Sequence, residues 1–334
     1  MLNTDWRSLH GGAFMGTRCL VTGGAGFIGS HIVEALTKLG ASVVVLDDLS
    51  GGAWDNVKPF KPETIEGSIL DRDALGKAAR GCKLVFHLAA LGSVPHSVER
   101  PVPYHEADAT GTVMVLEAAR HAGASRVVYS ASSSAYGASE LLPKTEDMPT
   151  APLSPYAAAK LAGEAYMSAY AGSYGIDTAS LRYFNIFGPR QNANSAYAAA
   201  IAAFATAALS GRNPTIYGDG EQSRDFTHVD NVVHANLLAA RSAKPIQGEV
   251  INVACGQRVT VNELVAEVIS FCDDSSLRAT HAPERAGDVR HSLADITRAK
   301  ALLGYEPIVG FREGLAETLQ WYAEQAERDA IRAS

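Results

Sequence analysis

Apolar and polar positions alternate in blocks along the chain from Thr17 onward. Short apolar runs rich in β-branched residues are each followed by a longer stretch with helical periodicity. Runs of this kind predict buried strands, and the periodic stretches between them predict helices. Strands are expected at 19–21, 43–46, 84–88, 127–130 and 250–253, with helices at 28–39 and 108–122 among others.

This alternation of strands and helices indicates the fold class. Strands that are separated by helices form βαβ units, whose parallel sheet is covered by helices on both faces. We therefore predict an α/β protein with a Rossmann-type, doubly wound parallel sheet. After Asn185 the pattern loosens into a Gly-, Pro- and Asn-rich stretch at 187–195, which predicts that the chain leaves the sheet to build a smaller mixed α/β unit.

The same pattern sets the expected domain boundaries. Residues 15–185 and about 228–258 are assigned to the Rossmann domain, because the late apolar run at 250–253 is typical of a further buried strand. The ranges of about 186–227 and 259–330 are assigned to the smaller unit. Residues 1–14 have no periodicity and include Gly11-Gly12, so they are expected to form a flexible N-terminal extension.

Composition and charge mainly exclude certain classes of protein. The chain has 334 residues, of which 47% are hydrophobic, and its formal net charge is −7. An acidic chain disfavours a broad basic surface for nucleic acid or anionic lipid, so a few arginines or backbone amides must bind any anionic ligand. The longest apolar run, 196–209, is shorter than the roughly 20 residues of a membrane span, and no signal-peptide core precedes the fold. We expect a cytoplasmic protein without a metal site, since the four cysteines lack metal-ligand spacing.

A glycine-rich turn, Thr22-Gly23-Gly24-Ala25-Gly26-Phe27-Ile28-Gly29, joins the first predicted strand to the first helix. Glycines allow a tight turn there and let the backbone approach a pyrophosphate at the helix N-terminus. Asp47 follows Gly29 by 18 residues, at the end of the second strand, where a carboxylate accepts hydrogen bonds from ribose hydroxyls. A carboxylate also repels a 2′-phosphate, and no Arg or Lys occurs between Asp48 and Lys58. The pattern therefore predicts NAD rather than NADP.

Candidate catalytic residues follow in order along the chain. Ser132-Ser133-Ser134 comes after a predicted strand, and Tyr156 and Lys160 lie four residues apart on one helix face. Lowering the pKa of a tyrosine from near 10 by about three units needs roughly 4 kcal/mol. One cation about 4 Å away supplies that at an effective dielectric constant of about 20. We predict that Lys160, together with the positive nicotinamide, makes Tyr156 a base and that Ser132 hydrogen-bonds the reacting hydroxyl.

These motifs together resemble the extended short-chain dehydrogenase/reductase family, and within it the NAD-dependent epimerase/dehydratase group, over residues 17–322. Within this group the chain resembles the bacterial 4-epimerases of UDP-glucose and UDP-N-acetylglucosamine. Besides the glycine turn, the resemblance rests on His87-Leu-Ala-Ala90, Ser132-Ser-Ser-Ala-Tyr-Gly137, Ser154-Pro-Tyr-Ala-Ala-Ala-Lys160, Leu181-Arg-Tyr-Phe-Asn185 and Ser223-Arg-Asp-Phe-Thr-His228.

The resemblance implies two sets of site residues and a homodimer formed by helices near 100–122 and 155–174. The implied NAD contacts are Gly23, Gly26, Phe27, Ile28, Gly29, Asp47, Ser68, Ile69, Leu88, Ala89, Ala90, Ser130, Tyr156, Lys160 and Tyr183. The implied UDP-sugar contacts are Ser93, Ser132, Ser133, Tyr156, Asn185, Tyr217, Arg224, Arg285, Asp288 and Ser292. Among them, Tyr217 is expected against the uracil, and Arg224 and Arg285 at the diphosphate, where the donor fork of arginine is suited to bind.

The resemblance also bears on the reaction. Ser133 and Ser134 stand where dehydratase relatives carry an Asp-Glu pair, which implies simple oxidation and re-reduction at C4 through a 4-keto sugar. Ser292 is small at a position that is bulky in glucose-restricted relatives, which implies that a 2-acetamido group is accepted. A UDP-glucuronate 4-epimerase or another nucleotide-sugar enzyme of the family remains an alternative, as does a non-catalytic NAD-binding protein. Ser68 and Asp108 depart from the Asp and Asn of many relatives.

Overall fold

The computed structural model describes residues 4–192, 200–284 and 289–333. Its centre is a seven-stranded sheet in which every neighbouring pair of strands is parallel. The strand order is β3 (Glu63–Glu66), β2 (Ser42–Asp47), β1 (Arg18–Thr22), β4 (Leu84–His87), β5 (Arg126–Ser132), β6 (Asp177–Tyr183) and β11 (Val250–Val253). The predicted Rossmann-type fold is confirmed.

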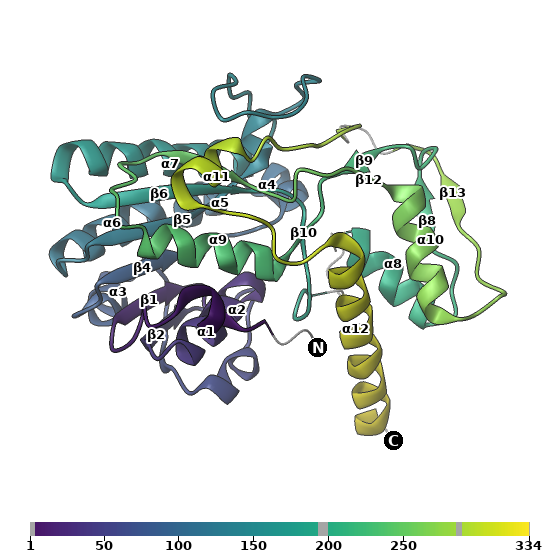
Figure 1. The fold of residues 1–334 in the computed structure, drawn as a ribbon, viewed down its shortest axis with the longest axis horizontal. Helices are drawn as coiled ribbons and strands as arrows, with labels where there is room; N and C mark the ends of the chain where they lie inside the picture. The colour runs from purple at the N-terminus through teal and green to yellow at the C-terminus, as the bar shows by residue number, and fades with distance from the viewer. Residues whose placement is uncertain (1–3, 193–199, 285–288, 334) are drawn as a thin grey trace.

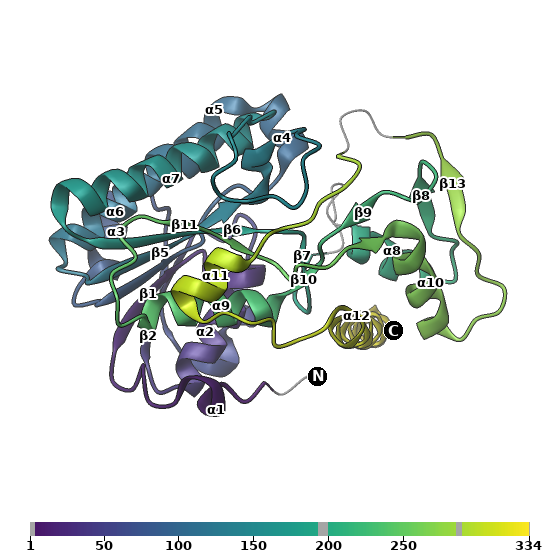
Figure 2. The ribbon, with the colours of Figure 1, turned by 45° about the horizontal axis from the view of Figure 1, so that its top comes forward.

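Helices cover both faces of this sheet, as Figures 1 and 2 show. One face carries α2 (Phe27–Lys38), α9 (Val229–Arg241) and α11 (Thr297–Leu303), and the other carries α3 (Arg72–Ala79), α6 (Gly111–His121) and α7 (Pro155–Tyr174). The strand order reverses between β1 and β4, and a crevice for ligands forms at such a reversal, beyond the carboxyl ends of the strands.

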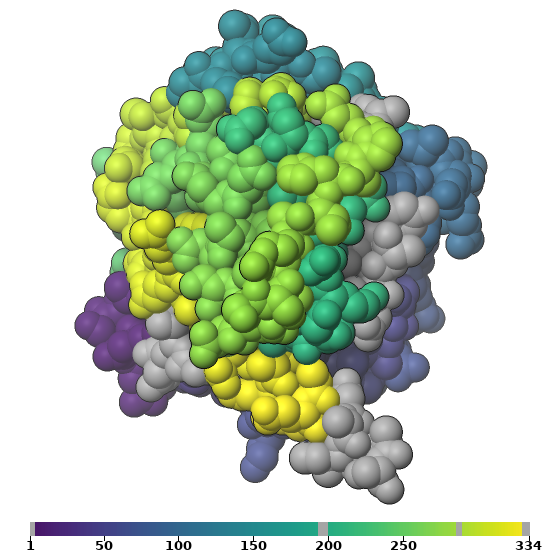
Figure 3. Space-filling view, turned by 90° about the vertical axis from the view of Figure 1, so that its right-hand side faces the viewer, coloured from purple at the N-terminus to yellow at the C-terminus, as the bar shows by residue number. Residues whose placement is uncertain are grey.

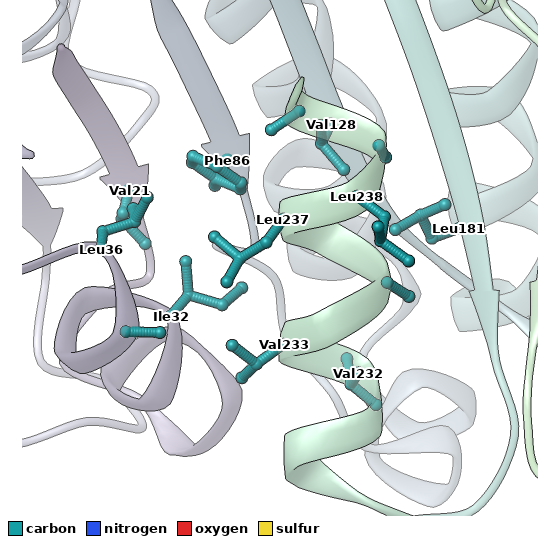
Figure 4. Close-up of a cluster of buried hydrophobic side chains, with 14 of the residues drawn as sticks. Val21, Ile32, Leu36, Phe86, Val128, Leu181, Val232, Val233, Leu237 and Leu238 are labelled. Carbon is teal, nitrogen blue, oxygen red and sulfur yellow. The ribbon is translucent and has the colours of Figure 1, made fainter. Parts of the chain in front are cut away.

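The first apolar core lies between the sheet and the α2/α9 layer. Figure 4 shows Val233 and Leu237 of α9 beside Ile32 of α2, with Phe86 and Val128 of the sheet above them. These side chains are at most 1% exposed. Burying a side chain of this size stabilises the fold by about 1.5–3 kcal/mol, so the packing of α9 fixes the segment from which the chain returns to the sheet.

The second unit has its own buried cluster, which includes Phe204, Leu264, Val268, Leu315 and Leu319. In the space-filling view of Figure 3 its green segments form most of the visible face, with α12 in yellow below them. Its elements are β7 (Ile186–Phe187), α8 (Ala200–Leu209), β8 (Thr215–Tyr217), β9 (Ser223–Arg224), β10 (Thr227–His228), β12 (Val259–Thr260), α10 (Val261–Cys272), β13 (Thr280–Ala282) and α12 (Phe311–Ala333). However, Leu303 and Tyr305 belong to the first core, so the end of the chain does not lie wholly with the second unit as 259–330 was assigned.

The N-terminal segment corrects one prediction. Residues 6–10 form the helix α1 (Trp6–His10), capped by Asp5, whose carboxylate accepts a hydrogen bond of 3.1 Å from the Ser8 amide. Trp6 and Phe14 are 5% and 0% exposed within the first core. The expected flexible extension is therefore wrong for residues 4–14, because a few apolar side chains anchor a segment too short to show periodicity. Residues 1–3 lie outside the described part of the chain.

Short elements complete the rim of the sheet: the 3₁₀ turns Trp54–Asn56, Lys58–Phe60 and Ser133–Tyr136, the helices α4 (Val94–Glu99) and α5 (Pro101–Tyr104), and a π-helical turn at His105–Thr110. Within the described ranges no helix is both long and apolar enough to cross a bilayer.

Candidate active site

The glycine turn forms one wall of a cavity of about 330 Å³ at the carboxyl end of β1. Gly23 has φ +68°, and a Cβ atom there would lie 2.6 Å from the amide nitrogen of Ala89. A Cβ atom on Gly29 would lie 2.2 Å from the carbonyl oxygen of Gly23. Both positions therefore require glycine. The turn ends at the first residues of α2, Phe27 and Ile28, where a helix has unpaired amide donors and a positive dipole end that attract an anion.

Asp47 lines the same cavity from the end of β2. Its carboxylate accepts hydrogen bonds of 2.8 Å from the amides of Ala25 and Leu49, which fix its orientation. Burial raises the pKa of Asp47, while these hydrogen bonds oppose the shift. Ser68 and Ile69 line the cavity beside it, on the side of β3.

The predicted cofactor residues lie together. Twelve of them line this cavity: Gly23, Gly26, Phe27, Ile28, Gly29, Asp47, Ser68, Ile69, Leu88, Ala89, Ala90 and Ser130. Tyr156, Lys160 and Tyr183 line a second cavity of about 580 Å³, which shares Phe27, Ile28, Leu88, Ala90 and Ser130 with the first. The glycine cradle, the helix N-terminus and the oriented carboxylate fit a dinucleotide whose nicotinamide end reaches the second cavity.

The second cavity brings together the predicted catalytic residues Ser132, Tyr156 and Lys160. Ser132 ends β5, where its Oγ accepts a hydrogen bond of 3.2 Å from the Ser134 amide. Tyr156 lies in the first turn of α7, which begins with Pro155 and is capped by the Ser154 hydroxyl, 3.1 Å from the Ala157 amide. A capped start with proline at the first position fixes where the helix begins and so where the phenol lies.

In the protein alone, burial is the main influence on the pKa of Tyr156. In the protein alone, burial raises its pKa to about 12, and a hydrogen bond with Ser132 only partly offsets the rise. Lys160 Nζ donates to the Ser130 carbonyl at 3.0 Å and lies 6.0 Å from the centre of the Tyr156 ring. In the protein alone, burial therefore outweighs the effects that would lower the pKa of Tyr156.

Asp108, on the π-helical turn, is a buried carboxylate near this pair. It is 1% exposed, and Oδ1 accepts a hydrogen bond of 2.8 Å from the Leu91 amide. Oδ2 has no hydrogen-bond partner in the described part of the chain. Burial raises the pKa of Asp108, and the Lys160 charge opposes that rise; the Asp108 charge in turn contributes to the raised pKa of Tyr156.

The far end of the second cavity contains Asn185, Arg224 and Ser292. The Asn185 side-chain amide donates to the Asp225 backbone carbonyl at 3.1 Å and to Ser292 Oγ at 3.5 Å. The Asp225 carboxylate accepts hydrogen bonds from three backbone amides, of Cys255, Gly256 and Ala294. Burial raises the pKa of Asp225 to about 6. Asp225 therefore joins two parts of the site, because its backbone carbonyl accepts from Asn185 and its carboxylate accepts from the segment that includes Ser292.

The remaining predicted substrate residues are placed less uniformly. Ser133 lines the second cavity, whereas Ser93 lies at its edge as the cap of α4, between the lining residues Gly92 and Val94. Tyr217 ends β8, is 39% exposed and lines neither cavity. Arg285 and Asp288 lie outside the described residues.

The lining residues that were not predicted include four with polar or titratable side chains, Tyr136, Lys144, Gln191 and His291. Tyr136 belongs to the motif Ser132-Ser-Ser-Ala-Tyr-Gly137, and its place in the site could have been inferred from that motif. Lys144 lies in the long connection between β5 and α7, where no spacing indicates a function, and only its burial at 3% exposure marks it.

The model of the NAD dependent epimerase/dehydratase family matches residues 19–254. A UDP-glucose 4-epimerase of Mycolicibacterium smegmatis is 39% identical over 319 residues, which cover 93% of this chain and 100% of that protein. The solved UDP-N-acetylglucosamine 4-epimerase of Methanobrevibacter ruminantium, in complex with UDP-N-acetylmuramic acid, is 40% identical with a TM-score of 0.88 and covers 93% of this chain and 99% of that one. The solved UDP-glucose 4-epimerase of Thermotoga maritima, with UDP-glucose, is 37% identical with a TM-score of 0.87. That match covers 93% of this chain and 100% of the Thermotoga maritima chain.

Proposed function

The chain belongs to the NAD-dependent epimerase/dehydratase family, and on that premise we propose that it inverts C4 of a UDP-hexose with NAD as its cofactor. The observation that carries the proposal is the continuity of the two cavities. One cavity has the glycine cradle and Asp47, and the other has Tyr156 beside Ser132. The similar solved epimerases bind UDP-sugars, which supports the same class of substrate for this chain.

Tyr156, Ser132 and Lys160 have different roles in this reaction. The glycine cradle and Asp47 would hold NAD, which would supply reversible hydride transfer at C4 of the sugar. Tyr156 accepts the proton of the C4 hydroxyl and later gives it back, and Ser132 hydrogen-bonds that hydroxyl. Burial holds the Tyr156 pKa at about 12 in the protein alone, so the phenol becomes a base only when positive charge enters the cavity. Lys160, held by the Ser130 carbonyl, adds to that charge.

The substrate side of the cavity is assigned to the nucleotide sugar. We place the diphosphate at Arg224 and Arg285, the uracil at Tyr217, and the sugar near Ser93, Ser133, Asn185, Asp288 and Ser292. Ser133 and Ser134, in place of the acidic pair of the dehydratases, support epimerisation without loss of water. The division into an NAD-binding unit and a nucleotide-sugar-binding unit is part of the same proposal.

The sugar itself is proposed from Ser292. The Ser292 side chain is small and lines the cavity, and its hydroxyl lies 3.5 Å from the side-chain amide of Asn185. A larger side chain would project into the space where the sugar lies. We therefore assign UDP-N-acetylglucosamine and UDP-N-acetylgalactosamine as substrates, together with the non-acetylated pair.

Replacing Ser292 with tyrosine tests this assignment. Ser292→Tyr should lower turnover of the acetylated pair about 100-fold while the non-acetylated pair loses much less, because the added ring occupies the acetamido space. Product C4 stereochemistry, read by NMR with each UDP-sugar, measures both activities. Ser275→Tyr, at an exposed serine of the second unit, is the control. The assignment is wrong if the wild-type protein epimerises neither acetylated sugar.

The charge of Asp108 gives a pH prediction. Activity needs an ionised Tyr156, so the acidic limb of kcat/KM against pH follows the pKa of the phenol. The Asp108 carboxylate raises that pKa, and Asp108→Asn removes the charge. The acidic limb of the variant should therefore move to lower pH. The exposed Asp55→Asn serves as control, and a limb that stays or moves to higher pH contradicts the role of this charge.

We also propose a homodimer through α4, α5 and α7. These neighbouring helices carry exposed apolar side chains, among them Val98, Val102 and Tyr166 at 64%, 63% and 43% exposed. Exposed apolar side chains gathered on adjacent helices are typical of a protein–protein interface. Light scattering on the holoprotein should give twice the 35.2 kDa chain mass, and a monomer at micromolar concentration would refute the dimer.

A further inference from the structure

The wall of the second cavity contains a lysine whose backbone is tightly positioned. The Lys144 amide donates to the Leu293 carbonyl at 2.7 Å, and its carbonyl accepts hydrogen bonds from the Asp295 amide at 2.8 Å and the Asn252 side chain at 2.9 Å. Lys144 thereby forms a parallel bridge with Ala294. These contacts join the β5–α7 connection to the segment that includes Ser292, so the position of Lys144 in the wall is fixed.

The Lys144 ammonium group is buried and has no acidic partner in the described part of the chain. The residue is 3% exposed, and Nζ donates to the Ser139 carbonyl. Burial lowers the pKa of Lys144, and no carboxylate among the described residues opposes that shift. The acid nearest in sequence, Glu146, instead accepts from the Asn252 amide at 2.8 Å and lies 3.8 Å from Arg298. A buried cation is costly unless an anion pairs with it, and an ammonium has three donors, of which the Ser139 carbonyl uses one.

The substrate diphosphate is not the natural partner for this charge. The Arg224 guanidinium donates to the Arg290 carbonyl at 3.2 Å, and Ser223 bridges His291. Lys144 bridges Ala294, three residues further along the same extended segment. Three extended residues span about 10 Å. Arg224 and Lys144 therefore contact opposite ends of the segment, with Ser292 between their contacts. With the diphosphate assigned to Arg224, this arrangement puts Lys144 on the side assigned to the sugar.

From this placement we infer that Lys144 makes the site prefer UDP-hexoses that carry a carboxylate on the sugar over their neutral counterparts. The inference rests on the proposed function and extends its substrate class to acidic sugars. A carboxylate is the substituent that would pair with a buried ammonium in the sugar part of the cavity, and a charge-assisted hydrogen bond to it would use the free donors. Two placements share this chemistry: a C6 carboxylate, as in a uronic acid, and a lactyl ether on C3, as in muramic acid.

The test compares charged and uncharged sugars on the holoenzyme. C4 epimerisation is measured with UDP-GlcA and UDP-MurNAc and with their uncharged counterparts UDP-Glc and UDP-GlcNAc, and the ratio of kcat/KM for acid over neutral is taken for each pair. In the wild type this ratio should exceed one for one of the pairs. That pair identifies whether the carboxylate is bound at C6 or on the C3 lactyl ether. Lys144→Met should lower that ratio about 30-fold, chiefly through KM, because a charged contact is lost.

Two further variants separate charge from structure. Lys144→Arg keeps the charge and should retain more of the ratio than Lys144→Met. Lys77→Met, at an exposed lysine of α3, is the matched control and should leave the ratio unchanged. Thermal melting shows whether each variant folds. Equal losses of kcat/KM for acid and neutral sugars in Lys144→Met would overturn the inference. They would show that the Lys144 side chain has only a structural role, through its hydrogen bond to the Ser139 carbonyl.

Binding separates failure of the inference from failure of the proposed function. If none of the four sugars is epimerised, the proposed function is wrong. Calorimetric titration of the NAD-loaded protein with UDP-GlcA, UDP-MurNAc and the two neutral sugars still decides the role of Lys144. Tighter binding of an acid that is lost in Lys144→Met supports selection of a carboxylate, and equal binding of acid and neutral sugars refutes it.

Discussion

Tyr156→Phe should lower kcat for C4 epimerisation by about 10³-fold, because the variant lacks the group that accepts and returns the C4 hydroxyl proton. No other side chain of the triplet can replace it. Ser132 has a hydroxyl that is far less acidic than a phenol, and Lys160 is committed to the Ser130 carbonyl at 3.0 Å. NAD content should stay close to that of the wild type, since the glycine cradle and Asp47 form the other cavity.

The measurement for Tyr156→Phe combines turnover with a spectroscopic signal. Product is quantified by NMR, and reduced nicotinamide is followed at 340 nm after adding substrate; both should be lost. Tyr166→Phe removes a hydroxyl from an exposed tyrosine of the same helix, 43% exposed, and should keep full activity. If Tyr156→Phe kept more than a tenth of wild-type activity, another group would have to be the base.

Local spacing explains why the dinucleotide site could be predicted. A strand, a glycine turn and a helix follow one another directly, so the residues that form the cradle are fixed by sequence order alone. The same holds for Tyr156 and Lys160, because one helical turn places them on the same face. The structure adds the reason for the glycines, namely the 2.2 Å approach of a Cβ on Gly29 to the Gly23 carbonyl.

Long-range packing explains what could not be predicted. Lys144 is buried because it bridges Ala294, far along the chain, and Trp6 because it joins a core that also includes α9. Neither contact leaves a periodic pattern in the sequence.

The second large effect is expected at the buried ion pair between Glu164 of α7 and Arg182 of β6. The guanidinium donates to both carboxylate oxygens, at 2.8 and 2.7 Å, and each side chain is 4% exposed. The Arg182 guanidinium also lies 4.7 Å from the centre of the Tyr136 ring, which lines the second cavity. The pair thus ties the catalytic helix to the sheet one turn beyond Lys160.

Glu164→Ala should lower the free energy of unfolding by about 3–5 kcal/mol, because Arg182 is then left as a buried, unpaired charge. The apparent Tm should fall by roughly 5–15 °C. Thermal unfolding followed by circular dichroism measures the change. Arg312→Ala removes a surface pair whose arginine side chain is 83% exposed, and it should cost at most about 1 kcal/mol.

The double variant Glu164→Met/Arg182→Met distinguishes an uncompensated charge from loss of packing. Removing both charges leaves no unpaired ion, so the double variant should be more stable than Glu164→Ala even though it changes more atoms. If the double variant were the less stable of the two, the pair itself would stabilise the fold beyond mutual neutralisation. Activity in the double variant then reports whether α7 still holds Lys160 and Tyr156 in place, since both precede Glu164 on the same helix.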